Sequence, residues 1–264
     1  MIKGKSKKEN VKRRKFLKTV ILSFASFIAP GYLLAEEQLH KVKKWILGKD
    51  YNPYEHYWGM GIDINKCIGC GRCADACKKE NNVPDVPFFF KTWVERYQIY
   101  EDGSTDVDSP NGAIYGFTSR NEREKKMVRS FFVPKICNHC DNPPCVQVCP
   151  VGATFITPDG VILVDSDYCI GCRYCIQACP YGARYIDPLK KTAEKCTFCY
   201  HRIVKGFVPA CVEVCPTQAR IFGELRKKAS PLVRFMRMNK LAVLKPSLNT
   251  EPKVYYANFD MEIN

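Results

Sequence analysis

The sequence predicts an α+β fold, and three observations support this prediction. The 16 cysteines of the 264-residue chain fall into four groups of four with a short, regular spacing. A Cys-Pro-x-x-Ala motif begins at the last cysteine of three of these groups, which indicates an internal repeat. Two apolar runs, 154–157 and 161–164, flank the turn signal Pro158-Asp159-Gly160 and predict a β-hairpin.

The cysteine spacing indicates iron–sulfur chemistry. A Cys-x2-Cys-x2-Cys turn directs three thiolates at one small volume, and the cysteine three residues later binds a neighbouring cluster in two-cluster ferredoxins. No cysteine is left over, so sixteen ligands at four per cluster predict four [4Fe-4S] clusters. The groups are group one (Cys67, Cys70, Cys73, Cys77), group two (Cys137, Cys140, Cys145, Cys149), group three (Cys169, Cys172, Cys175, Cys179) and group four (Cys196, Cys199, Cys211, Cys215).

Two other uses of cysteine fit this pattern less well. Structural zinc favours paired Cys-x2-Cys knuckles, two pairs per metal, rather than triplets with a trailing cysteine. Disulfide scaffolds are typically short and rich in cysteine throughout, whereas the first 66 and last 49 residues of this chain contain none. We therefore expect clusters rather than zinc or disulfide bonds.

Glycine and proline occur where cluster-binding turns need them. Gly69, Gly71 and Gly171 lie within the ligand turns, where the backbone approaches sulfide and its amides can donate hydrogen bonds. A proline follows the last cysteine of groups two, three and four and fixes φ as the chain turns away. Strand pairs and short helices around clusters indicate a ferredoxin-type fold. The repeats are Cys149-Pro150-Val151-Gly152-Ala153, Cys179-Pro180-Tyr181-Gly182-Ala183 and Cys215-Pro216-Thr217-Gln218-Ala219.

The amino-terminal sequence predicts an export signal. Residues 1–18 contain nine Lys or Arg and one Glu, a net +8 of the total +14, so most of the net positive charge lies in a leader rather than on a nucleic-acid surface. Arg13-Arg14 precedes an apolar stretch that ends at Ala35, and we expect residues 1–35 to be a twin-arginine signal segment. A basic arm with a core helix, or an uncleaved membrane anchor, remains an alternative.

The rest of the chain divides into three parts. We expect a linker or helix at 36–59, with apolar residues at helical spacing over 36–49, and a four-cluster ferredoxin-type domain at 60–223. Residues 224–264 form a basic carboxyl-terminal segment, which is either solvated charge or a contact with a partner subunit or anionic lipid.

Residues 78–136 form a β-rich insertion between groups one and two. Thr92 to Tyr100 and Met127 to Ile136 are rich in aromatic and β-branched residues and predict two strands, joined by a polar loop from Ser104 to Asn121. The insertion is expected either to cap the fold or to carry a docking surface.

No residue pattern in the chain points to catalysis. We find no nucleophile–base constellation, phosphate loop or dinucleotide fingerprint, so we expect an electron-transfer protein with no catalytic residues. His139 and His201 lie close to ligand cysteines, but each group already has four thiolates. Both histidines are therefore expected to be hydrogen-bond donors near a cluster or surface residues.

Several motifs match a known family: Cys67-Ile68-Gly69-Cys70-Gly71-Arg72-Cys73, Cys137-Asn138-His139-Cys140-Asp141-Asn142-Pro143-Pro144-Cys145, Cys169-Ile170-Gly171-Cys172-Arg173-Tyr174-Cys175, Lys195-Cys196-Thr197-Phe198-Cys199, Glu80-Asn81-Asn82-Val83-Pro84 and Lys253-Val254-Tyr255-Tyr256. With them, residues 60–257 resemble the four-cluster iron–sulfur subunit of the dimethyl sulfoxide reductase and polysulfide reductase family. That family includes the iron–sulfur subunits of tetrathionate and thiosulfate reductases, and related proteins of periplasmic sulfite- and nitrite-reduction complexes.

The resemblance implies two interleaved ferredoxin-like halves, which pair group one with group four and group two with group three. It also implies four ligand sets, which we name sites A to D. They are site A (Cys67, Cys70, Cys73, Cys215), site B (Cys77, Cys196, Cys199, Cys211), site C (Cys137, Cys140, Cys145, Cys179) and site D (Cys149, Cys169, Cys172, Cys175).

The resemblance further implies a role and a place in the cell. Electrons would pass between a polytopic membrane subunit with a quinone site, facing the half with sites C and D, and an exported molybdopterin catalytic subunit, facing the half with sites A and B. The protein would work in the periplasm, at the outer face of the cytoplasmic membrane. The alternatives are the same relay in a cytochrome- or sulfite-reduction-linked complex, and a standalone polyferredoxin shuttle.

Overall fold

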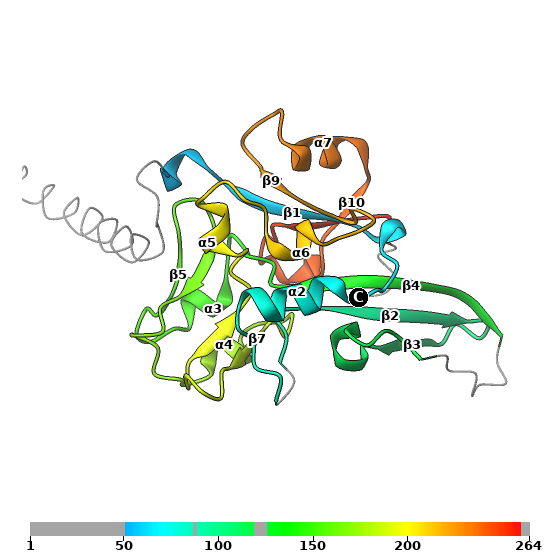
Figure 1. Cartoon of the computed structure of the whole chain (residues 1–264), viewed down its shortest axis with the longest axis horizontal. Coiled ribbons are helices and arrows are strands. Elements are labelled where there is room, and N and C mark those ends of the chain that lie inside the picture. Colours follow the sequence, from blue (N-terminus) through cyan, green and yellow to red (C-terminus); the bar gives the residue numbers. More distant parts are fainter. Residues whose placement is uncertain (1–50, 87–88, 119–125, 260–264) are drawn as a thin grey trace, which may run out of the picture. The chain divides into compact units, whose positions relative to one another are not determined.

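The computed structural model describes residues 51–86, 89–118 and 126–259. The signal segment expected at 1–35 and the helix expected at 36–49 lie outside these residues. Strands and short helices are mixed throughout the described part (Figure 1), which confirms the α+β class. No helix among the described residues is long and apolar enough to cross a membrane.

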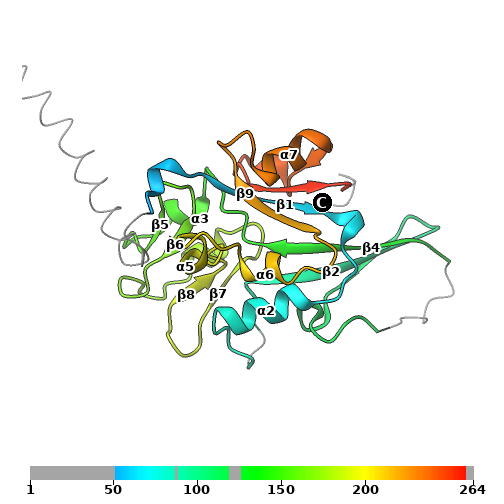
Figure 2. The same ribbon diagram turned by 45° about the horizontal axis from the view of Figure 1, so that its top comes forward.

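A four-stranded sheet joins the two ends of the described chain. Its order is β10-β11-β1-β9, with β1 parallel to β11 and antiparallel to β9. Helix α7 packs on β9 and β1 (Figures 1 and 2), and Met60 and Tyr256 are fully buried in the sheet. The bounds are β1 Trp58–Asp63, β9 Arg220–Glu224, α7 Pro231–Met238, β10 Leu241–Ala242 and β11 Val254–Ala257. This sheet crosses the predicted boundary between residues 223 and 224.

The insertion forms a three-stranded antiparallel sheet in the order β3-β2-β4. The two predicted strands are confirmed, as β2 Thr92–Tyr100 and β4 Met127–Ile136. The predicted polar loop is wrong in part, because it contains β3, Thr105–Asp108, and a 3-10 turn, η3, Pro110–Ala113. Asp108 of β3 pairs across the sheet, because Arg96 on β2 donates two hydrogen bonds to its carboxylate, at 2.9 and 2.7 Å.

Two hairpins follow two of the Cys-Pro-x-x-Ala repeats. The predicted one is confirmed: β5 pairs antiparallel with β6. A second hairpin, β7 with β8, was not predicted. Its turn is closed by Asp187, whose carboxylate accepts hydrogen bonds from the backbone amides of Leu189 and Lys190. The bounds are β5 Thr154–Ile156, β6 Ile162–Val164, β7 Arg184–Ile186 and β8 Ala193–Lys195.

Short helices carry cysteines from every group. Helix α2 packs against α6, and α3 packs against α4, so group one meets group four and group two meets group three. The helices are short because the ligand turns and the prolines that follow them end the helical conformation. Their bounds are α2 Arg72–Glu80, α3 Pro144–Gln147, α4 Tyr174–Gln177, α5 Tyr200–Ile203 and α6 Ala210–Glu213; the remaining 3-10 turns are η1 Pro53–Glu55, η2 Ile64–Lys66 and η4 Pro246–Leu248.

Candidate iron–sulfur site

All sixteen cysteines lie in the described residues and are free thiols. Only Cys70 and Cys172 are exposed, five others are half-buried, and nine are buried. Among the described residues, no three His, Cys, Asp or Glu side chains are arranged to hold a single metal ion. A [4Fe-4S] cluster has a different requirement, because its four cysteine ligands surround a body of iron and sulfide.

The four thiols of site A surround one cavity. Cys67, Cys70 and Cys73 of group one line it together with Cys215, which comes from group four. Burial raises the pKa of Cys67 to about 11, and the neighbouring thiols of Cys73 and Cys215 add to this rise, although the backbone amide of Gly69 opposes it. A sulfur-lined cavity of this kind fits a cluster bound by thiolates from two groups.

The turn at site A leaves no room for a larger residue at Gly71. Gly71 has a φ of +69°, in the left-handed region that favours glycine. A Cβ atom at this position would overlap the carbonyl oxygen of Ala113 in η3. The insertion therefore packs directly on the ligand turn that precedes α2.

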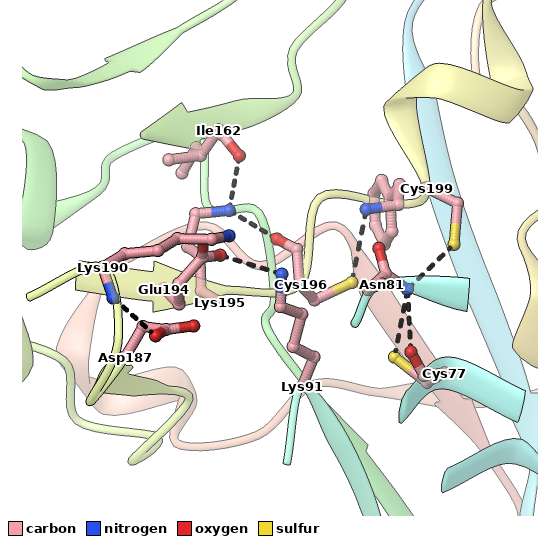
Figure 3. Close-up of polar contacts among 11 residues, drawn as sticks. Cys77, Asn81, Lys91, Ile162, Asp187, Lys190, Glu194, Lys195, Cys196 and Cys199 are labelled. Carbon is pink, nitrogen blue, oxygen red and sulfur yellow. Dashed lines mark hydrogen bonds and ion pairs between the residues drawn. The ribbon is translucent and has the colours of Figure 1, made fainter. Parts of the chain in front are cut away.

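Site B joins Cys77 of group one to the cysteines of group four. The amide Nδ2 of Asn81 lies 3.5 Å from Cys77 Sγ and 3.7 Å from Cys199 Sγ, and so donates to thiols of both groups (Figure 3). Burial raises the pKa of Cys77, and the Cys211 and Cys199 thiols raise it further. The backbone amide of Phe198 donates to Cys196 Sγ at 3.3 Å, as expected around a cluster ligand.

Site C brings Cys179 of group three to the first three cysteines of group two. Burial raises the pKa of Cys140 to about 12, with further contributions from the thiols of Cys137, Cys145 and Cys179. Arg184 Nη2 donates to Cys145 Sγ at 3.2 Å.

Site D is joined less directly. Cys175 packs in a small buried cluster with Cys145 and Ala193, and Cys169 packs against it; the Ala193 amide donates to Cys169 Sγ at 3.4 Å. Cys149 follows α3 by two residues, and α3 packs on α4, which carries Cys175. Among the described residues, no hydrogen bond joins Cys149 to the other three thiols of site D. Burial raises the pKa of Cys149, but the amides of Thr154, Val151 and Ala153 outweigh it, and the pKa is lowered.

The two histidines near the cysteine groups do not contact a thiol in the described structure. His139 is fully buried and stacks on Phe198, with ring centres 3.7 Å apart, while its Nδ1 accepts a hydrogen bond from the Ile162 amide at 3.1 Å. Burial holds the pKa of His139 well below its ordinary value, so the ring is neutral. His201 Nε2 lies 2.6 Å from Glu80 Oε1. His139 therefore packs the interior, and His201 forms a polar contact between α5 and α2.

Sequence reasoning missed the polar residues that contact the thiols. Arg220 Nη2 donates to Cys73 Sγ at 3.4 Å, in the same way that Arg184 donates to Cys145, and Asn81 donates to Cys77. One signal was available: the residue directly after the Cys-Pro-x-x-Ala repeat is Arg in two of the three repeats and Thr154 in the other.

Comparisons with known proteins indicate iron–sulfur clusters in this chain. Two family models described as 4Fe-4S dicluster domains match residues 66–153 and 128–225. The B subunit of tetrathionate reductase from Salmonella typhimurium is 42% identical over 207 residues, covering 78% of this chain and 74% of that protein. Its namesake from Archaeoglobus fulgidus is 46% identical over 197 residues, covering 75% and 80%. The B chain of polysulfide reductase from Wolinella succinogenes is 37% identical over 199 residues, covering 75% and 92%.

Proposed function

Because this chain belongs to the family of iron–sulfur electron-transfer subunits of the tetrathionate, polysulfide and dimethyl sulfoxide reductases, we propose that it relays electrons through four [4Fe-4S] clusters. The relay connects a membrane subunit with a quinone site to an exported catalytic subunit that contains molybdopterin. Its relatives are named as subunits of reductases, which supports partner subunits for this chain.

The observation that carries this proposal is the meeting of thiols from distant groups. At site A, Cys215 shares a cavity with three cysteines of group one. At site B, Asn81 contacts thiols of groups one and four. The packing of α2 on α6 and of α3 on α4 supports two interleaved ferredoxin-like halves, one holding sites A and B and the other holding sites C and D. On this basis all sixteen cysteines are assigned as ligands.

The exposure of the cysteines supports two ends for the relay. Cys70 of site A and Cys172 of site D are the two exposed cysteines, and each is close in sequence to an exposed isoleucine, Ile68 or Ile170. Exposed apolar residues beside a ligand turn suit contact with another subunit. We assign the site A end to the catalytic subunit and the site D end to the membrane subunit. A standalone polyferredoxin shuttle, the other alternative, would need no fixed partner at either end.

The chain's own residues would hold and shield the clusters. When bound, [4Fe-4S] clusters accept and pass on single electrons. Nine buried thiols would fix their positions away from water, and the Asn81 side chain and the amides of Phe198 and Ala193 would donate to the ligand sulfurs. We further propose that residues 1–35 direct folded protein across the membrane, so that it works at the outer face. A cytochrome- or sulfite-reduction-linked complex is the alternative setting for the same relay.

Metal analysis of the anaerobically purified protein tests the cluster count. Four clusters require about 16 iron atoms and 16 acid-labile sulfides per chain, four of each per cluster. Iron and sulfide should be measured on the same sample as zinc. About eight of each, or zinc in whole-number amounts, would contradict the assignment of all four groups.

A further inference from the structure

Two buried arginines occupy equivalent places in the two halves of the molecule. Arg184 and Arg220 each follow a Cys-Pro-x-x-Ala repeat directly and begin the next strand, β7 or β9. They are 5% and 3% exposed. Each donates from Nη2 to the third cysteine of another group: Arg184 to Cys145 at 3.2 Å and Arg220 to Cys73 at 3.4 Å.

Each arginine lies near thiols of two sites rather than one. Arg220 donates to Cys73 of site A, and α6, which carries Cys211 of site B, packs against both α2 and the strand β9 that begins with Arg220. Arg184 donates to Cys145 of site C, and Cys145 packs with Cys175 of site D in one buried cluster. Arg220 is therefore at the junction of sites A and B, and Arg184 at the junction of sites C and D.

A buried lysine lies at the remaining junction. Lys195 is 1% exposed, and its Nζ donates to the backbone oxygens of Ile162 and Cys196 (Figure 3). Cys196 belongs to site B, and Ile162 lies on β6 of the hairpin that follows group two, so the Lys195 ammonium group joins these two parts of the chain. Lys195 thus stands between the two halves.

These three cations lack an ion pair with any carboxylate among the residues that the structure describes. Other buried cations have one: Arg96 pairs with Asp108 at 2.7 Å and Lys91 with Glu194 at 2.8 Å. In addition, Arg220 Nη1 is buried without a hydrogen-bond partner in the described part. A buried charge left uncompensated is costly, so an anionic group at the cysteine sites is required to balance it.

We propose that Arg220, Lys195 and Arg184 are shared counter-charges at the A–B, B–C and C–D junctions of the relay, and that each raises the reduction potentials of the two clusters beside it. This inference rests on the proposed function. Each hop oxidises one cluster by one electron and reduces the next, with no proton or group transferred. Reduction adds negative charge to a cluster. Because the protein interior has a low dielectric constant, a buried cation beside the cluster stabilises this charge more than a cation exposed to water does.

Neutral variants of the full chain test the proposal. Arg220→Gln, Lys195→Gln and Arg184→Gln should each lower the midpoint potentials of the two flanking clusters only, measured by anaerobic redox titration with paramagnetic resonance. Arg220→Gln should lower the potentials of clusters A and B, Lys195→Gln those of B and C, and Arg184→Gln those of C and D. Arg220→Lys and Arg184→Lys keep the charge, so the potentials of their flanking clusters should stay close to the wild-type values.

Arg96→Gln is the matched control. Arg96 is 8% exposed, but its side chain donates to Asp108 and to the Thr118 carbonyl rather than to a thiol, so its loss should move the four potentials far less than loss of the three cations. Equal shifts of all clusters in every variant, no shift in the glutamine variants, or the same shifts in the lysine variants would overturn the proposal.

A variant that fails to take up iron also gives an answer. If Arg220→Lys takes up iron and both Arg220→Gln and Arg220→Met do not, the site requires the positive charge of this residue. If none of the three variants takes up iron, Arg220 is needed for packing alone, and the proposal is overturned at that junction. The wild-type protein separates the two proposals. Fewer than four clusters there would reject the proposed function, while four clusters with unmoved potentials in the variants would reject only this inference.

Discussion

Burial of the ligand thiols opposes the charged form that iron needs. Burial raises the pKa of Cys67 to about 11 and that of Cys140 to about 12, so both are neutral near pH 7 in the metal-free protein. Coordination to a metal deprotonates a thiol outright. Cluster binding therefore releases protons and supplies the free energy that offsets the burial of these thiolates.

The crossed assignment of the fourth ligands can be tested with substitutions that each replace one ligand sulfur by oxygen. Cys179→Ser replaces a soft thiolate by a harder oxygen ligand at site C, so cluster C should shift in potential or lose an iron. Cys149→Ser should do the same to cluster D. Paramagnetic resonance of the two reduced variants, compared with wild type, identifies the cluster that each change affects. If both substitutions altered the same single cluster, the crossed ligand sets would be wrong.

The residue scale also shows where sequence reasoning reaches its limit. Cysteine spacing predicts ligand type because three thiolates in one turn must converge whatever the rest of the fold does. The contacts of Arg184 and Arg220 with Cys145 and Cys73 depend on strands that bring residues 39 and 147 positions apart together. The position after the repeat marks these two arginines, but a pattern of neighbouring residues does not show which distant thiol each one contacts.

At the scale of elements, the insertion supports a ligand turn rather than only covering the fold. Gly71 lies against the carbonyl group of Ala113 in η3. Gly103, in the turn between β2 and β3, also has a positive φ, +79°, but has nothing within 4 Å of a Cβ position. The two glycines thus share a backbone conformation and differ in their surroundings.

Alanine at these two positions separates backbone strain from close packing. Gly103→Ala should cost about 1–2 kcal/mol of stability, from the left-handed conformation alone, and keep its full iron content. Gly71→Ala adds a clash with η3, worth typically about 1–3 kcal/mol more, and should also lose iron from site A. Denaturant unfolding and iron analysis measure both effects. Equal stabilities and equal iron contents in the two variants would show that the Ala113 contact is unimportant.

The elements that sequence predicted are those with a local signal. Strands β2 and β4 and the β5–β6 hairpin follow from β-branched and aromatic residues and from a turn signal. Strand β3 was missed because its alternating acidic residues are typical of a loop, whereas in the structure Asp108 pairs with Arg96 across the sheet. The pairing of β1 with β11 was missed because it joins Met60 to Val254, far apart in the sequence.

At the scale of the whole molecule, export should depend on the amino-terminal arginines. Arg13 and Arg14 lie outside the described residues, but their sequence context is that of a twin-arginine signal. Replacing both with Lys keeps the charge, so it should leave folded, iron-loaded protein in the cytoplasm. Fractionation with iron analysis of each fraction measures this. Normal arrival of the double variant at the outer face of the membrane would rule out the twin-arginine route.

The order of the sites predicts which clusters a break in the relay isolates. The packing of α2 on α6 and of α3 on α4 supports the proposal that sites A and B lie in one half and sites C and D in the other, and Lys195 joins Cys196 of site B to Ile162 in the other half. Electrons entering at site D should therefore pass through C and B before they reach A.

Removing cluster B should stop electrons between the two halves. A Cys196→Ala/Cys199→Ala variant, assembled with its partner subunits, loses two thiolates from site B. After addition of quinol, clusters C and D should still be reduced while cluster A stays oxidised, as observed by rapid-freeze paramagnetic resonance. Chemical reduction with dithionite serves as the control, because it should reduce cluster A and show that it is intact. Normal quinol-driven reduction of cluster A without cluster B would exclude a linear relay, because electrons would then have another route across the molecule.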